Sequence, residues 1–204
     1  MQDVVTVARE LLGKCLVHRT AEGETSGIIV ETEAYAGHTD AACHSYKRKS
    51  PGREPGGSEH RTNIMFAKGG YAYVYLIYGM YNCFNVVANV PDNPEAVLIR
   101  AVEPISGLDL MKRRRNMTDS TKNLQKNLCS GPGKLCIAMG ITRQHYGLDL
   151  CRGDLFITPG RPIETDAIQA TPRINVSYAG EDSLLPYRFV LKDSQYLSTK
   201  QFLK

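Results

Sequence analysis

The sequence lacks any long run of apolar residues and any recognisable secretory signal. A helix that spans a bilayer needs about 20 consecutive apolar residues, and no stretch of this 204-residue chain provides them. A signal peptide would show a basic start, a short apolar segment and a small-residue cleavage site. We therefore expect a reducing compartment, cytoplasm or nucleus, in which the six cysteines stay as free thiols.

Motifs of several familiar chemistries are also missing. No two cysteines have the C-x-x-C spacing of a zinc cage. The H-x-E and P-C-x-x-C patterns of zinc-dependent base deaminases are absent. The stretch Cys129–Cys136 (CSGPGKLC) is rich in glycine but does not match the P-loop pattern G-x-x-x-x-G-K-[ST]. We therefore expect neither a metal nor a cofactor.

The net charge is small, +4, but the basic residues are unevenly spread. Lys112–Arg115 form a basic run, and a second group crowds one loop: Lys47, Arg48, Lys49, Arg53, His60 and Arg61. Each group alone is typical of a solvated surface, and together they are compatible with a polyanionic partner. The length suits one core, so we expect a single domain over residues 1–204.

The most informative stretch is Tyr71–Asn89, YAYVYLIYGMYNCFNVVAN. Alternation with period two predicts two strands of a β-hairpin, with Gly79 in the turn. Hairpin turns usually carry small polar residues, yet this tip carries Tyr78, Met80 and Tyr81. Either the tip folds back onto the core, or it is a wedge that inserts between stacked bases of a nucleic acid.

A second predicted strand, Gly27–Tyr35 (GIIVETEAY), places two carboxylates on one face. Glu31, Glu33 and Tyr35 alternate with apolar residues, so they share a side of the strand. Charged groups are rarely buried unless paired. This face therefore either lines a cleft or neutralises an arginine, and Arg100 in the predicted strand Ala96–Val102 is the natural candidate.

The remaining elements suggest an α/β domain of the α+β type. Asp3 or Thr6 is expected to cap a helix that Gly13 ends, and Ser106-x-x-Asp109 is expected to start another. The stretch Cys129–Cys136 resembles the entrance of a third helix, with its proline in the first turn and Gly140 as the stop, and this entrance with Lys134 suits a phosphate. Further strands are expected at 15–18, 154–157, 173–178 and 187–191. We expect a mixed, mostly antiparallel curved sheet with flanking helices and a protruding hairpin.

Five motifs in order, ETEAY, AACHS, the hairpin, VLIRAVEP and CSGPGKLC, carry a resemblance. Over about residues 7–187 the chain resembles the alkyladenine (3-methyladenine) DNA glycosylases of the human and bacterial type that lacks a helix-hairpin-helix motif. This resemblance implies a monofunctional enzyme that flips a damaged purine out of duplex DNA and hydrolyses its N-glycosidic bond. A monomer is expected, beside the nucleoid in a bacterium or in the nucleus of a eukaryote.

The resemblance also implies roles for individual residues. Glu33 would activate the water and Arg100 would hold it. The flipped base would be enclosed by Tyr35, His44 and Tyr75, with Asn85 restricting which purines fit. Tyr78 would fill the vacated stack, with Met80 and Tyr81 beside it in the minor groove. Contacts to the DNA backbone are implied for Arg61, Thr62, Ser130, Gly131 and Lys134.

One segment departs from the family pattern, and two other functions compete. Family members carry T-P-R-N before the Met-Phe pair, whereas alignment on Met65-Phe66 puts Thr62 at the position of that asparagine. A binding module without catalysis would explain the basic loop and the tip, but not a carboxylate beside Tyr35. A glycosidase for free nucleosides would need neither the wedge nor the basic loop.

Overall fold

Eight strands form one open sheet that is organised around the long strand β2 (Gly23–Tyr35). This arrangement comes from a computed structural model, which describes residues 2–53 and 59–203. The strand order is β3-β4-β5-β2-β1-β6, and every pairing between the described strands is antiparallel. The prediction of a mixed α/β fold with a mostly antiparallel sheet and a few flanking helices is confirmed.

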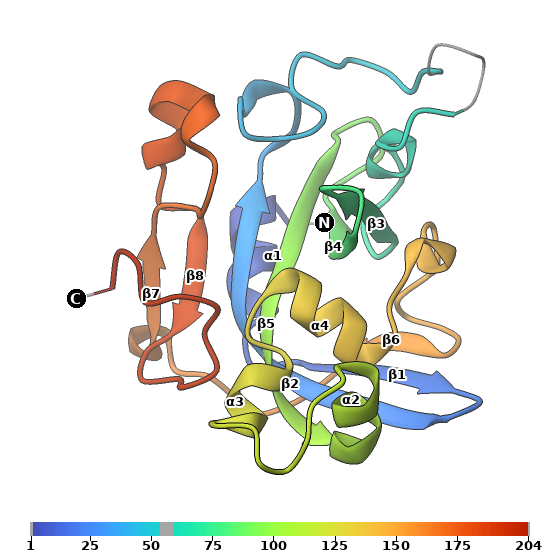
Figure 1. Ribbon diagram of the computed structural model, residues 1–204. Coiled ribbons are helices and arrows are strands. Elements are labelled where there is room, and N and C mark those ends of the chain that lie inside the picture. The colour runs from blue at the N-terminus through green and yellow to red at the C-terminus, as the bar shows by residue number, and fades with distance from the viewer. Residues whose placement is uncertain (1, 54–58, 204) are drawn as a thin grey trace.

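The long strand β2 pairs with three other strands of the sheet. One edge of β2 pairs with β5 (Glu95–Ser106) over most of its length. Its other edge pairs first with β1 (Cys15–Thr20) and further along with β8 (Arg188–Leu191). The sheet is completed by β3 (Ala72–Ile77), β4 (Tyr81–Ala88), β6 (Leu155–Thr158) and β7 (Ile168–Thr171). Figure 1 shows β7 and β8 as a pair at one side of the molecule.

Four α-helices flank the sheet. Asp3, one of the two predicted caps, begins α1 (Val4–Glu10) by accepting hydrogen bonds from the amides of residues 5 and 6. The helix ends at Glu10, before the predicted Gly13, and packs against β2 and β5. The helix α4 (Pro132–Met139) packs against β4 and β5, and α2 (Leu108–Arg114) and α3 (Leu124–Leu128) lie beside it (Figure 1). Proline begins α4, and Gly140 ends it in the left-handed conformation, as its sequence predicts.

Two local predictions are wrong. Ser106 does not cap a helix, because it is the last residue of β5 and its hydroxyl pairs with that of Ser26; α2 starts after Gly107, whose φ is 72°. Residues 173–178 are not a strand. Asn175 has a positive φ of 60°, and the amide of Ile174 donates to a side chain instead of a neighbouring strand.

None of the helices within residues 2–53 and 59–203 is long and apolar enough to cross a membrane. The six cysteines are all free, as predicted. Part of the basic loop, residues 54–58, lies outside the described residues.

Candidate active site

A cavity of about 510 Å³ lies over one face of β2, β5, β4 and β3. The strand register explains its lining, because directly opposed residues share a face of a sheet. Tyr35 lies opposite Ala96, and Asn85 lies opposite both Leu98 and Tyr73. The volume is within the range of about 300–1,000 Å³ that is usual for ligand pockets.

The other walls of the cavity come from three separate segments. One is the turn that carries His44, one is the start of α4, and one is an irregular segment from 174 to 178. The last two contribute Pro132, Gly133, Ile174, Asn175, Val176 and Tyr178. Arg173 joins the irregular segment 174–178 to the turn that carries His44, since its guanidinium donates to Asp40 and to the carbonyl of Ala34. The cavity is thus assembled from parts of the chain that are far apart in sequence.

The Glu33 carboxylate lies directly behind this cavity and has no exposed surface. Its Oε2 accepts hydrogen bonds from the Tyr35 hydroxyl at 2.8 Å and from Arg100 Nη1 at 3.2 Å. Its Oε1 accepts from the backbone amide of Ile174 at 2.7 Å. All three donors line the cavity, whereas Glu33 itself is one layer deeper. The alternative that this strand face lines a cleft is therefore wrong for the two carboxylates, because neither of them is among the residues that line the cavity.

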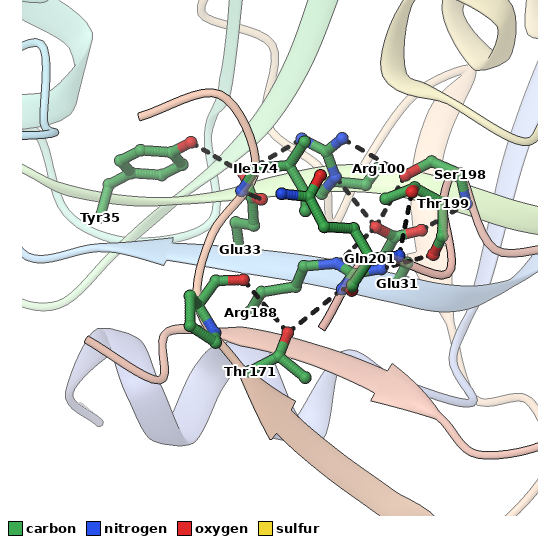
Figure 2. A network of polar contacts seen from close by, with 11 residues as sticks. Glu31, Glu33, Tyr35, Arg100, Thr171, Ile174, Arg188, Ser198, Thr199 and Gln201 are labelled. Atoms are coloured by element: carbon green, nitrogen blue, oxygen red, sulfur yellow. Dashed lines mark hydrogen bonds and ion pairs between the residues drawn. The ribbon is translucent and has the colours of Figure 1, made fainter. Parts of the chain in front are cut away.

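Glu31 is equally buried but has a different set of partners (Figure 2). It accepts hydrogen bonds from Arg100 Nε at 3.0 Å, from Arg188 Nε at 2.8 Å, and from the amide of Ser198 at 2.6 Å. Burial alone would raise the pKa of Glu31, but the charges of Arg100 and Arg188 outweigh it and the pKa is lowered. For Glu31 the ion-pair alternative is confirmed.

Arg100 joins the two carboxylates. The register between β2 and β5 shifts on both sides of Glu31, which leaves Val30 extra on β2 and Arg100 extra on β5. Bulges of this kind redirect a side chain next to a functional site. Burial disfavours the charged guanidinium, but Glu33 and Glu31 together raise the pKa of Arg100. The arginine is therefore a fixed positive charge that lines the cavity, and its predicted pairing with a carboxylate of the neighbouring strand is confirmed.

Comparison with known proteins identifies the family. The model of the family described as methylpurine-DNA glycosylase (MPG) matches residues 1–195. The chain belongs to this family. A protein of Clostridium novyi (strain NT) named "Putative 3-methyladenine DNA glycosylase" is 46% identical over 98% of this chain and 95% of its own length. A relative of the same name from Methanocella arvoryzae is 47% identical over 98% of this chain and 92% of its own length. The predicted family and enzyme class, a DNA glycosylase, are confirmed.

In this family member, the three residues predicted to enclose a base, Tyr35, His44 and Tyr75, all line the cavity, and so does Asn85, which was predicted to restrict which purines fit. The rings of His44 and Tyr75 meet edge to face, with their centroids 4.6 Å apart. His44 Nδ1 lies 2.8 Å from the Tyr73 hydroxyl. Burial, with Arg61 and His60 nearby, lowers the pKa of His44 to about 4, so its imidazole is neutral at physiological pH.

Asn85 is held rigidly at the wall of the cavity. Its amide nitrogen donates to the backbone carbonyl of Tyr73 at 3.0 Å, and the residue is almost fully buried. A side chain that is fixed in this way presents a constant shape to a ligand, because its rotamer cannot change without loss of the hydrogen bond.

The hairpin tip does not fold back onto the core. Tyr78 is 76% exposed and Met80 is 65% exposed, although Tyr78 and Tyr81 also border the cavity. Tyr78 and Gly79 both have positive φ, 53° and 71°, and the amide of Met80 donates to the carbonyl of Ile77. This is the pattern of a type I′ turn, in which asparagine is favoured over a bulky residue at the first central position.

The residues predicted to contact a DNA backbone lie in different environments. Arg61 and Lys134 are exposed, and Gly131 is partly so, which leaves these three free to meet a phosphate. Thr62 has no exposed surface and its hydroxyl lies 2.8 Å from His60 Nδ1. Ser130 is also buried, at 7% exposure, against β5. We therefore do not assign a phosphate contact to Thr62 or to the Ser130 side chain, because packing covers both.

Several residues of the site escaped the sequence analysis. They are Ile174, whose amide binds Glu33, together with Arg173, Arg188 and Ser198. A signal existed for Arg188, since it lies within the predicted strand 187–191 and a buried arginine requires a carboxylate, as was argued for Arg100. The sequence had no comparable signal for Ser198 or for the amide of Ile174.

Proposed function

We propose that this DNA glycosylase is monofunctional and excises damaged purines from duplex DNA by flipping them into the cavity. The substrates would be alkylated or deaminated purines such as 3-methyladenine, 7-methylguanine, ethenoadenine and hypoxanthine. The observation that carries the proposal is the position of the Glu33 carboxylate, immediately behind a cavity walled by Tyr35, His44 and Tyr75. A base must leave the stack before any enzyme can reach its glycosidic bond.

The aromatic wall is suited to an extracted base. Unpairing and unstacking a base costs a few kcal/mol, and stacking on an aromatic side chain returns about 1–3 kcal/mol per base. Contacts with Tyr35 and Tyr75 on the two sides of a purine would therefore offset much of that cost. The fixed Asn85 amide would then exclude purines whose ring substituents collide with it.

Glu33 has the capacity for general base catalysis. A carboxylate has about four acceptor positions, and Tyr35, Arg100 and Ile174 occupy three of them. The position that remains would accept a proton from water. The water oxygen would bond to C1′ of the deoxyribose, its proton would pass to Glu33, and the electron pair of the C1′–N bond would leave with the base. A positive charge on an alkylated purine makes that departure easier.

The hairpin tip supports insertion into the duplex. A tyrosine with positive φ is strained by about 1–3 kcal/mol, and such strain is retained mainly where function requires it. Tyr78 would fill the gap left by the flipped base, with Met80 and Tyr81 in the minor groove, as apolar wedges do in other DNA-binding proteins. Arg61, Gly131 and Lys134 would bind phosphates on either side, and one protein molecule would suffice for one site.

The decisive test is the Glu33→Gln variant in a single-turnover assay. The substrate is an oligonucleotide duplex with one hypoxanthine or ethenoadenine, and hot alkali reveals each abasic product. We expect the excision rate to fall at least about 10²–10⁴-fold, because a positioned general base contributes that much. Affinity for the damaged duplex should stay within a few-fold of wild type.

Glu24→Gln is the matched control, since Glu24 lies on the same strand but pairs with Arg19 at the surface. It should excise at the wild-type rate. An active Glu33→Gln enzyme beside a folded but inactive Glu31→Gln enzyme would overturn the assignment of the base. Wild-type protein that binds these duplexes without releasing any base would overturn the proposed substrate range.

A further inference from the structure

The segment that follows β8 returns to the interior and completes the polar network behind the cavity. The amide and the hydroxyl of Ser198 donate to Glu31 at 2.6 Å and 2.8 Å, although the two residues are 167 positions apart in sequence. The Ser198 hydroxyl also accepts a hydrogen bond from Arg100 Nη2 at 3.3 Å. One side chain thus touches both an anchor carboxylate and the arginine that binds Glu33 (Figure 2).

The same segment satisfies the other arginine. Arg188 is fully buried, and its Nη2 donates to the carbonyl of Thr199 at 2.9 Å while its Nη1 donates to the carbonyl of Gln201 at 3.0 Å. A buried guanidinium needs partners for its whole fork of donors. Residues 198–201 therefore close the network without lining the cavity, and they lie beyond the residues matched by the family model.

The geometry explains how this closure reaches the site. Arg100 has three anchored groups, with Nε on Glu31, Nη2 on Ser198 and Nη1 on Glu33. With Glu31 alone the guanidinium could pivot about its Nε contact, and the Ser198 hydroxyl removes that freedom. Catalytic groups lose rate when their geometry shifts by about 1 Å. The hydroxyl is thus one of the contacts that hold the guanidinium while its Nη1 meets Glu33.

We propose that Ser198 is a positioning residue of the active site, and that the segment 198–201 is part of its catalytic apparatus. Ser198 acts through Arg100 on Glu33 and does not itself touch DNA. This inference rests on the proposed function, because it assumes that Glu33 is the general base.

The test compares Ser198→Ala, Ser198→Thr and Ser194→Ala in the single-turnover excision assay. Ser194 lies in the same terminal segment, and its hydroxyl accepts a local hydrogen bond from the amide of Tyr196, so its variant is the control. All rates are measured well below the unfolding midpoint of every variant. We expect Ser198→Ala to lose roughly 10- to 100-fold in excision rate at saturating enzyme, because it removes hydrogen bonds to charged groups.

The separation of rate from binding tells positioning from a structural role. Affinity for the damaged duplex should change less than about 3-fold, Ser198→Thr should restore most of the rate, and Ser194→Ala should match wild type. Wild-type excision by Ser198→Ala would overturn the inference. A rate loss that Ser198→Thr does not restore would also overturn it. So would an equal loss of affinity for the damaged duplex, or an equal loss of rate in Ser194→Ala.

Failure of this inference is distinguishable from failure of the proposed function. An inactive Glu33→Gln enzyme together with a fully active Ser198→Ala enzyme would remove Ser198 from the site and keep Glu33 as the base. A fully active Glu33→Gln enzyme would remove the basis of both.

Discussion

The Glu31 carboxylate and the Arg188 guanidinium form an ion pair of 2.8 Å in which neither side chain has any exposed surface. The pair joins β2 to β8 at the place where these strands lie side by side. Arg100 binds the same carboxylate, so the single negative charge of Glu31 partly neutralises the positive charges of two buried arginines. It thereby serves as the anchor of the site, while Glu33 is the carboxylate next to the cavity.

The first prediction concerns this anchor. Glu31→Gln leaves two buried guanidinium groups without their shared negative charge, and breaking a buried pair costs about 3–5 kcal/mol. We expect a loss of that size in the free energy of unfolding, measured by urea denaturation. Glu103→Gln, which breaks a partly exposed pair with Arg161, should cost no more than about 1 kcal/mol. Equal losses in the two variants would show that Glu31 is not an anchor.

The second prediction concerns stability against pH. Burial lowers the pKa of His44 from 6.5 to about 4, so the unfolded chain binds the proton more readily than the folded protein does. The contribution of His44 to stability is complete above pH 6.5 and declines as pH falls from there towards 4, with a slope of at most about 1.4 kcal/mol per pH unit.

Replacement of this histidine should flatten that decline. We expect the midpoint temperature of thermal unfolding to fall less for His44→Asn than for the wild type when the pH is lowered from 7 to 4.5. His38→Asn, at an exposed position in the preceding turn, is the control and should follow the wild-type curve. If the midpoint temperature of His44→Asn depends on pH as that of the wild type does, the acid sensitivity comes from other groups.

The third prediction concerns the hairpin tip. Tyr78→Ser removes the group proposed to occupy the vacated stack, and stacking of about 1–3 kcal/mol corresponds to roughly a 5- to 150-fold loss in the flipping equilibrium. Fluorescence of 2-aminopurine beside the damaged base measures flipping directly. Stability should not fall, because the side chain is mostly exposed. Unchanged flipping would rule out Tyr78 as the wedge.

The fourth prediction separates phosphate binding from flipping. Lys49 is exposed in the basic loop, and each lysine that binds a phosphate contributes about −0.9 to the slope of log K against log salt concentration. Lys49→Ala should reduce the magnitude of this slope by about that amount, in titrations of undamaged duplex at several salt concentrations. Tyr78→Ser should leave the slope unchanged. A wild-type slope in Lys49→Ala would place this residue outside the interface.

The fifth prediction concerns the reaction type. Within residues 2–53 and 59–203 no group of three His, Cys, Asp or Glu side chains is placed to hold a metal ion, and no lysine is among the residues that line the cavity. We expect full excision in EDTA and no covalent DNA adduct after borohydride treatment. Activity that zinc or magnesium restores after EDTA, or a trapped adduct, would contradict the proposed hydrolysis by water.

Local patterns were sufficient for several parts of the site. Alternation in Gly27–Tyr35 placed Glu33 and Tyr35 on one face, and a strand arginine with no polar neighbours required a carboxylate, which correctly paired Arg100 with β2. The unusual residues at the hairpin tip marked it as a special site but left open whether it packs on the core, and the structure shows that it is exposed. These inferences succeeded since period and residue type are properties of a few adjacent residues.

The sequence by itself determined that Glu31, Glu33 and Tyr35 share one face of a strand, and that Arg100 in another strand needs a carboxylate. It did not determine which glutamate would be the anchor, because Glu31 and Glu33 are two residues apart on the same strand face. That choice was made by tertiary structure: β8 brings Arg188 and the terminal segment brings Ser198 to Glu31, whereas the irregular turn after β7 brings the Ile174 amide to Glu33. Contacts between residues more than 140 positions apart in sequence depend on how the strands are ordered in the sheet, and no local pattern encodes that order.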